Sequence, residues 1–396
     1  LVPGLPFVPF ILGASILAIA AVLAGRIEDP VLREAAPTEE VAKPAKRSLG
    51  DLMDVDEIHV KFSPSLVPAV MEPGAGLESR IINMRRHLVT EFGFIIPEVR
   101  LTDDALLPSD CYKIQIQGVD VASSVLRPGK LLILTNADVD LDVAGEDVQE
   151  PVYGAPARWI READHELAAE LGLPVIAPGE VVATHLLETL RGNFGRLLTR
   201  RALRKLLDNF VATSDPDRAT ANRKLLDEFV PDKVPVDVLQ NVLRMLLDER
   251  VSIRNLPLIL EAIADARTAN ASLDDTCEHV RRRIAFHIVS TLSEPDGSLP
   301  LIQLAPEWEA KFAEHERVEN GVADIALPPD EFNRLAGSVK GAIARTATRA
   351  PNPAIATSAR RRRFVRDVLE AKGISNSVLS FEEIGNTTKL SLLGTA

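Results

Sequence analysis

The chain has 396 residues, of which 46% are hydrophobic and 26% charged, and its formal net charge is −12. This composition excludes a disordered chain, and the length predicts several folded domains. The excess of acidic residues excludes the broad basic surface by which proteins hold nucleic acid, so no nucleic-acid partner is expected.

Residues 1–25 are apolar and carry no charge, and the first charged residue is Arg26. A signal peptide would begin with a basic segment, and a buried core helix would show polar residues on one face. The run is instead close to the length that crosses roughly 30 Å of hydrocarbon. It predicts a transmembrane helix, the last of a longer membrane domain, and everything after about residue 26 is then expected to be cytoplasmic.

Residues 26–56 are charged, rich in Ala and Pro and almost free of apolar periodicity, which predicts a flexible linker. The exceptions are Leu49 and Leu52, an apolar pair in polar surroundings. Exposed leucines in such a linker are typical of a segment that docks onto another surface.

An α/β pattern follows the linker. Apolar residues at helical spacing predict a helix from Leu77 to Phe92, ended by Gly93. Residues 136–150 are an acidic loop, and a helix is predicted over about 157–171. Alternating or β-rich runs predict strands at 58–62, 96–102, 112–118, 130–135 and 173–178.

From Glu180 the pattern changes to one helix after another, with apolar stripes through residues 236–266. The last part of the chain returns to α/β. Its helix over about 358–371 begins with four consecutive arginines. Strands are predicted at 299–304, 353–358, 377–381 and 389–393.

The sequence contains no complete calcium-loop or nucleotide-binding motif. Asp138, Asp140 and Asp142 have the spacing of a calcium loop, but Val143 and Gln149 replace its Gly and Glu. We therefore expect a solvated acidic loop. The chain contains no GxxxxGK[ST], GxGxxG or GxSxG motif, so no cofactor or metal is expected.

Other candidate residues have simpler interpretations. His165 and Glu166 begin a zinc-protease pattern, but its second histidine is replaced by Ala169. His185 lies among aliphatic residues, where a satisfied, partly buried histidine is expected. Arginines 360–363 have no interleaved aromatics, which favours a solvated or ion-paired face over a docking site for an acidic partner.

The two cysteines, Cys111 and Cys277, lie far apart without a CxxC pair, which is typical of a reducing compartment. Together with the missing motifs, they predict a binding and assembly protein and no enzyme.

Four stretches resemble one family: "PGLPFVPF" (3–10), "VYGAPARWI" (152–160), "GEVVATHLLETL" (179–190) and "DERVSIRNLPLILEAIADA" (248–266). They are similar to the export-gate subunit of type III secretion, the FHIPEP family, which has flagellar and injectisome branches. The similarity runs in order through essentially the whole chain. The opening "PGLPFVPF" favours the flagellar branch.

The resemblance implies an α+β cytoplasmic domain of several subdomains, preceded by one transmembrane helix. The implied plan is an α/β subdomain interrupted by an insertion, then a helical subdomain, then a C-terminal α/β subdomain. Changes in composition fit boundaries at 57–128 with 178–197, 129–177 for the insertion, 198–280 and 281–396.

The resemblance also implies a chaperone-docking dimple between the first two subdomains. Its acidic and aromatic residues correspond to Glu150 and Tyr153, its threonine to Thr184, and Ile176 would line its floor. An apolar dimple of this kind accepts an amphipathic helix, with a carboxylate at the rim to orient it. Thr184 could instead bond within its own helix, and Tyr153 could be a core aromatic.

In two places the sequence departs from the family pattern. Ser63 and Pro64 occupy the positions of a usual Gly-Tyr pair, and Leu49 replaces a linker aromatic. The first change puts the local strand geometry in doubt, and the second predicts a weaker or differently packed ring contact through Leu49 and Leu52.

The function implied is a subunit of the flagellar protein export gate in the bacterial inner membrane. Its partners would be further copies in a nonameric ring, export chaperones with their cargo, other membrane subunits of the gate and the separate export ATPase complex. The alternatives are the injectisome gate and, from a different class, a membrane-tethered enzyme with an unrecognised site.

Overall fold

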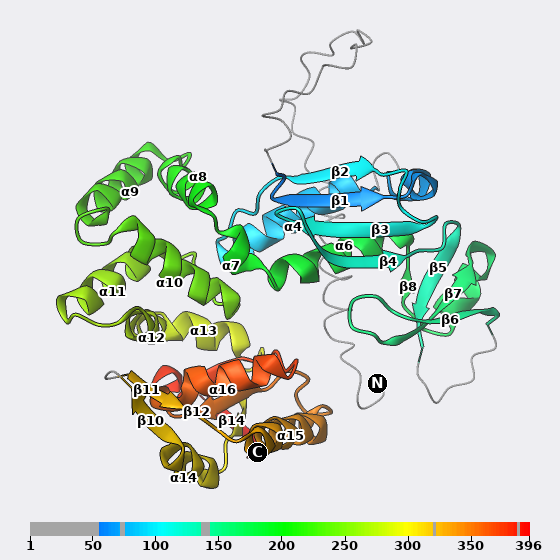
Figure 1. Cartoon of the computed structure of the whole chain (residues 1–396). Coiled ribbons are helices and arrows are strands. Elements are labelled where there is room, and N and C mark those ends of the chain that lie inside the picture. The colour runs from blue at the N-terminus through cyan, green and yellow to red at the C-terminus, as the bar shows by residue number, and fades with distance from the viewer. Residues whose placement is uncertain (1–54, 72–75, 136–142, 320–321, 386–388) are drawn as a thin grey trace. The chain divides into compact units, whose positions relative to one another are not determined.

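The computed structural model describes residues 55–71, 76–135, 143–319, 322–385 and 389–396 (Figure 1). The expected transmembrane helix, nearly all of the linker, and Leu49 and Leu52 lie outside these ranges, as do Asp138, Asp140 and Asp142. Among the described residues no helix has the length and hydropathy of a membrane span. The chain divides into two compact units, an N-terminal unit that ends at Lys205 and a C-terminal unit from Leu206 to Ala396.

The N-terminal unit begins with a four-stranded sheet in the order β2-β1-β3-β4. The alternation in β1 buries Ile58, Val60 and Phe62, while the helical spacing from Leu77 to Phe92 forms α4 as predicted. Gly93 ends α4 in the left-handed conformation that glycine adopts without strain. The elements are β1 (Ile58–Phe62), η1 (Pro64–Leu66), α3 (Val67–Val70), α4 (Leu77–Phe92), β2 (Val99–Asp103), β3 (Cys111–Ile116), β4 (Val119–Val125), α6 (Pro178–Arg191) and α7 (Phe194–Leu197).

A second four-stranded sheet, in the order β6-β7-β5-β8, lies between β4 and α6 in sequence. The helix predicted over 157–171 is wrong in its first half, because residues 156–161 form β7 between β5 and β6. The end of the acidic loop is likewise strand β6. The elements are β5 (Lys130–Leu134), β6 (Gly145–Gln149), β7 (Pro156–Arg161), η2 (Glu162–Asp164), α5 (His165–Glu170) and β8 (Val175–Ile176).

Helix α8 (Arg200–Val211) leads from the N-terminal unit into the C-terminal one. Five helices follow in the described residues 216–292, and three of them begin with side-chain caps at Asp215, Asn255 and Ser272, which accept hydrogen bonds from backbone N–H groups of the first turn. The apolar stripes of the last four form the helical core, to which the first of the five helices adds no fully buried residue. The five helices are α9 (Pro216–Phe229), α10 (Val236–Asp248), α11 (Leu256–Thr268), α12 (Leu273–Arg283) and α13 (Ala285–Leu292).

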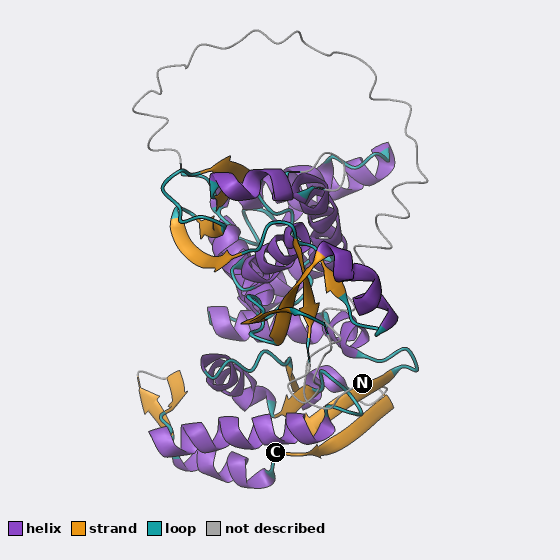
Figure 2. Cartoon of the chain, turned by 90° about the vertical axis from the view of Figure 1, so that its right-hand side faces the viewer, coloured by secondary structure: helices purple, strands orange, loops and turns teal. Residues whose placement is uncertain are grey.

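The C-terminal unit ends in a parallel sheet with the order β13-β12-β9-β14. Ile302, Ile355 and Val378 from three of its strands pack against α14, α15 and α16. Figure 2 shows helices beside the strands around the C-terminus. The elements are β9 (Ser298–Gln303), α14 (Pro306–Glu314), β10 (Glu316–Glu319), β11 (Val322–Ile325), α15 (Pro329–Thr346), β12 (Ala354–Thr357), α16 (Ala359–Ala371), β13 (Val378–Ser380), α17 (Phe381–Ile384) and β14 (Lys389–Thr395).

Candidate functional site

The turn between β6 and β7 carries two of the predicted site residues, Glu150 and Tyr153. Its main chain closes twice, because the Glu150 N–H donates to the Ala155 carbonyl at 2.8 Å and the Gly154 N–H donates to the Glu150 carbonyl at 3.0 Å. Gly154 has φ +68°, a left-handed conformation that favours glycine. The short "EPVYGAP" sequence therefore folds into a defined loop that presents Tyr153.

The Glu150 carboxylate folds back onto its own turn. Its Oε1 accepts the Val152 N–H at 2.6 Å and its Oε2 accepts the Tyr153 N–H at 2.8 Å. The residue is only 2% exposed. Burial raises the pKa of Glu150 above its ordinary value, and the hydrogen bonds from the Tyr153 and Val152 backbone offset this only in part.

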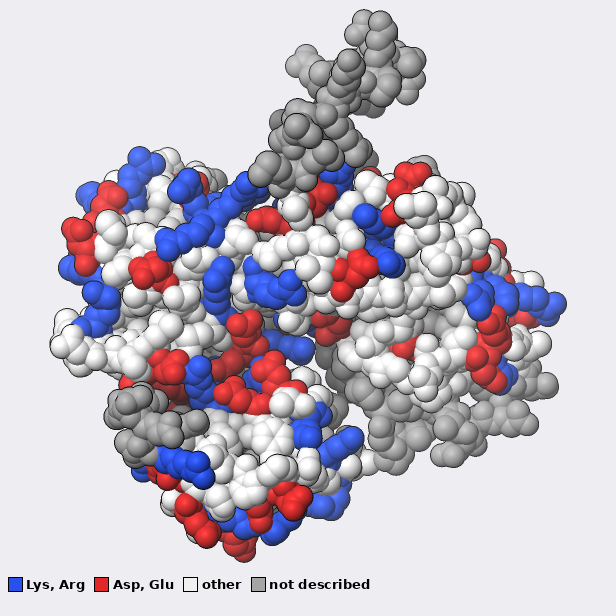
Figure 3. Space-filling model, viewed as in Figure 1, with Lys and Arg blue, Asp and Glu red and all other residues white. Residues whose placement is uncertain are grey.

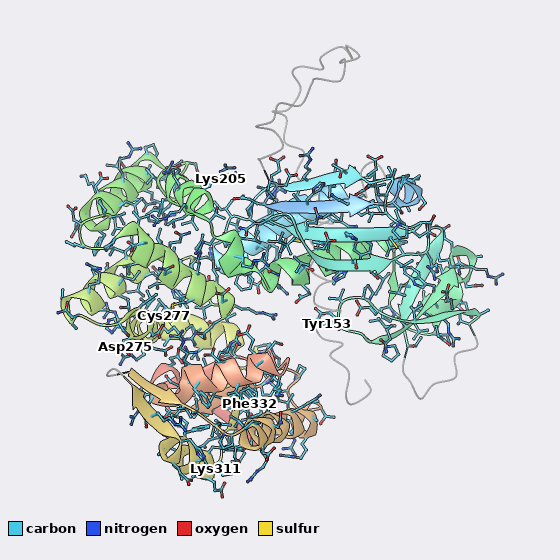
Figure 4. All side chains as sticks on the ribbon, in the orientation of Figure 1. Tyr153, Lys205, Asp275, Cys277, Lys311 and Phe332 are labelled. Atoms are coloured by element: carbon cyan, nitrogen blue, oxygen red, sulfur yellow. The ribbon has the colours of Figure 1, made fainter. Side chains whose placement is uncertain are left out.

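Tyr153 is 38% exposed and lies against helix α6 (Figure 4). Burial of its body and the carboxylate of Glu188, which accepts a hydrogen bond from the hydroxyl, raise the pKa of Tyr153. Glu188 is bonded to Arg191 Nη1 at 2.9 Å, and Arg191 Nη2 reaches Glu91 of α4 at 3.2 Å. The hydroxyl is thus anchored while part of the ring remains accessible.

Thr184 lies one helical turn before Glu188 on α6. Residues four apart share a helix face with their Cβ atoms about 5–6 Å apart, so Thr184 and Tyr153 belong to the same surface. Thr184 is half-buried and, with the described residues, its hydroxyl forms no hydrogen bond. The alternative that it bonds within its own helix is therefore not observed.

Beneath this surface, His185 of α6 and Tyr112 of β3 form a buried pair. The Tyr112 hydroxyl and His185 Nδ1 lie 2.7 Å apart in a hydrogen bond. Burial lowers the pKa of His185, whereas burial and the Glu150 charge raise the pKa of Tyr112. The expected satisfied, partly buried histidine is confirmed.

Ile176, the fourth predicted residue, lies on β8 and pairs with Leu132 of β5, the strand against which α6 packs. It is half-buried. The structure thus places the buried Glu150 and the half-exposed Tyr153 in one turn beside α6, the helix that carries Thr184, and it places Ile176 on strand β8. The docking role of all four stays a prediction.

Sequence reasoning missed Glu188, Arg191 and Tyr112. The spacing of Thr184, Glu188 and Arg191 at i, i+4 and i+7 does place them on one helix face, which is a usable signal. Nothing in the sequence indicates that Tyr112, 73 residues before His185, is its partner.

Arginines 360–363 form an ion-paired face, as expected. Arg361 bonds Glu309 at 3.2 Å, Arg362 bonds Glu249 at 2.5 Å, Arg360 pairs with Glu316 and Arg363 with Asp274. Both signs of charge occur in each part of the surface seen in Figure 3. Within the described ranges no cluster of His, Cys, Asp and Glu could hold a metal ion.

A model described as the FHIPEP family matches residues 1–389 of the chain. The chain is 32% identical over 404 residues to the flagellar biosynthesis protein FlhA of Caulobacter vibrioides, covering 100% of this chain and 56% of that protein. The chain spans about half the length of the curated relatives it matches.

Two solved structures share the fold. The Chlamydia pneumoniae CdsV protein superposes with a TM-score of 0.72 at 22% identity, covering 89% of this chain and 99% of that one. A cryo-EM structure titled nonameric EPEC SctV-C gives a TM-score of 0.67 at 18% identity, covering 86% and 98%. They confirm the expected mixed α/β fold with several subdomains, while the expected transmembrane helix lies outside the described residues.

Proposed function

The chain belongs to the FHIPEP family, and from that premise we propose that it is a membrane-anchored subunit of a flagellar type III protein export gate. Relatives of known name that cover the chain are called flagellar biosynthesis proteins. In this proposal residues 1–25 cross the bacterial inner membrane and the residues after about 26 face the cytoplasm. The gate's other membrane subunits and the export ATPase complex are further proposed partners.

The observation that carries the proposal is the way the chain presents Tyr153. A half-exposed aromatic ring stands on a closed turn, and its hydroxyl bonds Glu188 of α6, which lies one helical turn after Thr184. Aromatic rings fixed over apolar surfaces are common anchor points for amphipathic helices. A chaperone helix that carries cargo is the proposed occupant, with Ile176 at the edge of the same surface.

A ring is the second part of the proposal. One structural neighbour is titled as nonameric, and we assign the same assembly to this chain. Leu49 and Leu52 would each contribute about 1.5–3 kcal/mol if buried against the next subunit. Replacing both by alanine should reduce ring assembly, seen by negative-stain microscopy, without changing the melting temperature. A lower melting temperature with normal rings would place the pair within its own subunit.

The parallel sheet supports a docking role over an enzymatic one. Its strand order is one in which other proteins bind nucleotides at the carboxyl ends of the strands. Here the connection from β9 to α14 contains no glycine, and Glu307 and Glu309 lie in the first turn of α14. Those carboxylates oppose a phosphate at that helix end, so no cofactor is proposed.

The test is a binding measurement with a purified flagellar chaperone–cargo complex encoded in the same genome. Tyr153→Ala should weaken binding by about 2 kcal/mol, as loss of an anchoring aromatic does, and Tyr153→Asp or Thr184→Met should also weaken it. Leu106→Ala is the matched control, since Leu106 is 93% exposed in the same unit and distant in sequence from the site. Unchanged binding by all three site variants would remove chaperone docking from this surface.

A further inference from the structure

We infer that Glu150 is a positioning residue that holds Tyr153 in place from within the turn, and that the Tyr153 ring, not the Glu150 carboxylate, contacts the partner at this turn, facing an apolar side chain. This inference rests on the proposed docking function. It differs from the role that the resemblance implies, in which a carboxylate at the rim contacts the partner.

Both oxygens of the Glu150 carboxylate already accept hydrogen bonds from within the chain. Each of its oxygens accepts one backbone N–H, from Val152 at 2.6 Å and from Tyr153 at 2.8 Å. With 2% of the residue exposed, a cationic side chain of a partner has no surface to approach. The carboxylate instead satisfies two N–H groups that the turn would otherwise leave unpaired.

The carboxylate is also buried and not presented at the surface, because Glu150 is only 2% exposed. Its charge helps burial raise the pKa of the Tyr112 hydroxyl, and that hydroxyl is itself fully buried and bonded to His185 of α6. The Glu150 charge therefore lies near a buried pair, away from the solvent that a partner would approach through.

Glu188 is the other carboxylate beside Tyr153, and it is also bound within the chain. Glu188 is held by Arg191 at 2.9 Å, and the guanidinium also bonds Glu91 and lies 5.9 Å from the centre of the Phe92 ring. Glu188 is thus also occupied within the chain. With both neighbouring carboxylates used internally, the surface offered at this point is an aromatic ring on a fixed turn.

The first experiment needs no partner. Hydrogen exchange of the full chain in detergent, read at residue level over 150–155, measures the Val152 and Tyr153 amides directly. Glu150→Gln should speed their exchange by about tenfold or more, because the amide side chain can accept only one of the two bonds. Glu150→Asp should preserve slow exchange, since aspartate accepts from the same backbone positions in turns.

Glu146→Gln is the matched control. Glu146 lies on β6 four residues earlier and pairs with Arg127 at 2.7 Å at the surface. Loss of this ion pair should leave the hydrogen exchange of the Val152 and Tyr153 amides unchanged. Exchange at Val152 and Tyr153 that stays unchanged in Glu150→Gln would overturn the inference, whatever the outcome of any binding assay.

The second experiment is a double-mutant cycle with the same chaperone–cargo complex. Glu150→Gln should weaken binding by about tenfold in the wild-type background and by less than about twofold once Tyr153 is alanine, because it acts through that ring. The dissociation constants of Glu150→Gln and of the wild type should differ by the same factor of about ten at low and high salt. Additive effects, or a ratio that shrinks with salt, would make Glu150 a direct contact. No binding even by the wild type would refute the proposed function and leave the exchange result standing.

Discussion

The C-terminal unit buries the guanidinium groups of Arg281 and Arg362 among carboxylates from several helices, whereas the N-terminal unit buries the Glu150 carboxylate against its own backbone. In the first group Arg362 of α16 forms ion pairs with Glu249 and Glu278, and Arg281 of α12 forms ion pairs with Glu249 and Glu383. In the second, the Glu150 carboxylate accepts hydrogen bonds from the backbone N–H groups of its own turn. Both groups remove charge from water, but only the first supplies the opposite charge.

The pKa values show what this difference means. Burial alone would raise the pKa of Glu249, but the charges of Arg281 and Arg362 outweigh it and hold that pKa at about 2. No cation does this for Glu150, whose pKa is raised. A buried carboxylate that is paired with arginines, such as Glu249, joins the elements that carry the pair. A buried carboxylate without a cation, such as Glu150, costs stability and therefore indicates a functional position.

The largest expected effect breaks the ionic group of the C-terminal unit. Arg362 is fully buried, so Arg362→Ala leaves Glu278 without its cation and Glu249 with Arg281 as its remaining ion pair. The substitution should lower the free energy of unfolding by about 3–5 kcal/mol. The chain has two tryptophans, Trp159 in the N-terminal unit and Trp308 in the C-terminal unit. Urea unfolding followed by fluorescence in a Trp159→Phe background therefore reports on the C-terminal unit.

Arg360→Ala is the control for this measurement. Arg360 is the neighbouring arginine on α16, and its side chain is 63% exposed in its pair with Glu316. Exposed pairs contribute about 0–1 kcal/mol, so the control should unfold almost as the wild type does. Equal losses from the two variants would mean that burial does not distinguish these arginines.

Acid should change the contributions of Glu249 and Glu150 to the free energy of unfolding in opposite directions. Because the pKa of Glu249 is lowered on folding, its contribution of about 3 kcal/mol is present above its ordinary value of 4.5 and is lost as the pH falls toward about 2. Because the pKa of Glu150 is raised, the folded N-terminal unit takes up that proton first and gains stability as the pH falls toward 4.5.

The measurement is urea unfolding from pH 7 to pH 3, with each tryptophan observed alone. Glu249→Gln should remove the part of the acid loss seen through Trp308, and Glu150→Gln should remove the gain seen through Trp159. Each substitution removes a part of the pH dependence of the unfolding free energy. If the parts removed by Glu249→Gln and by Glu150→Gln have the same sign, the comparison is contradicted.

The sequence predicts the regular elements well where their own pattern is strong. The helix Leu77–Phe92 and the strand Ile58–Phe62 begin and end as expected. The first half of the helix predicted over 157–171 is wrong because the pairing of β7 with both β5 and β6 decides the structure there, whereas His165–Glu170 do form a helix. A strand in the middle of a sheet depends on partners that its own residues do not reveal.

The site was predicted in part for the same reason. The resemblance singles out Glu150, Tyr153 and Thr184, and the structure places the first two in one turn beside the helix that carries the third. That the Glu150 carboxylate folds onto the Val152 and Tyr153 N–H groups depends on a side-chain rotamer, which the sequence does not show. The Arg362–Glu249 pair joins residues 113 positions apart, and four arginines in a row carry no information about which carboxylates they meet.

The smallest expected effect uses the two tyrosines of the chain, Tyr112 and Tyr153, which are both in the N-terminal unit. Tyr112→Phe removes the buried hydroxyl bonded to His185, which leaves the Nδ1 atom without that partner and should cost about 1–2 kcal/mol of unfolding free energy. Tyr153→Phe removes the hydroxyl of a residue that is 38% exposed, and Glu188 keeps its bond to Arg191, so the substitution should cost no more than about 0.5 kcal/mol. Urea unfolding read through Trp159 measures both. Equal costs would show that the hydroxyl of Tyr153 is as deeply bound as that of Tyr112, and the contrast between a structural floor and an accessible ring would then be lost.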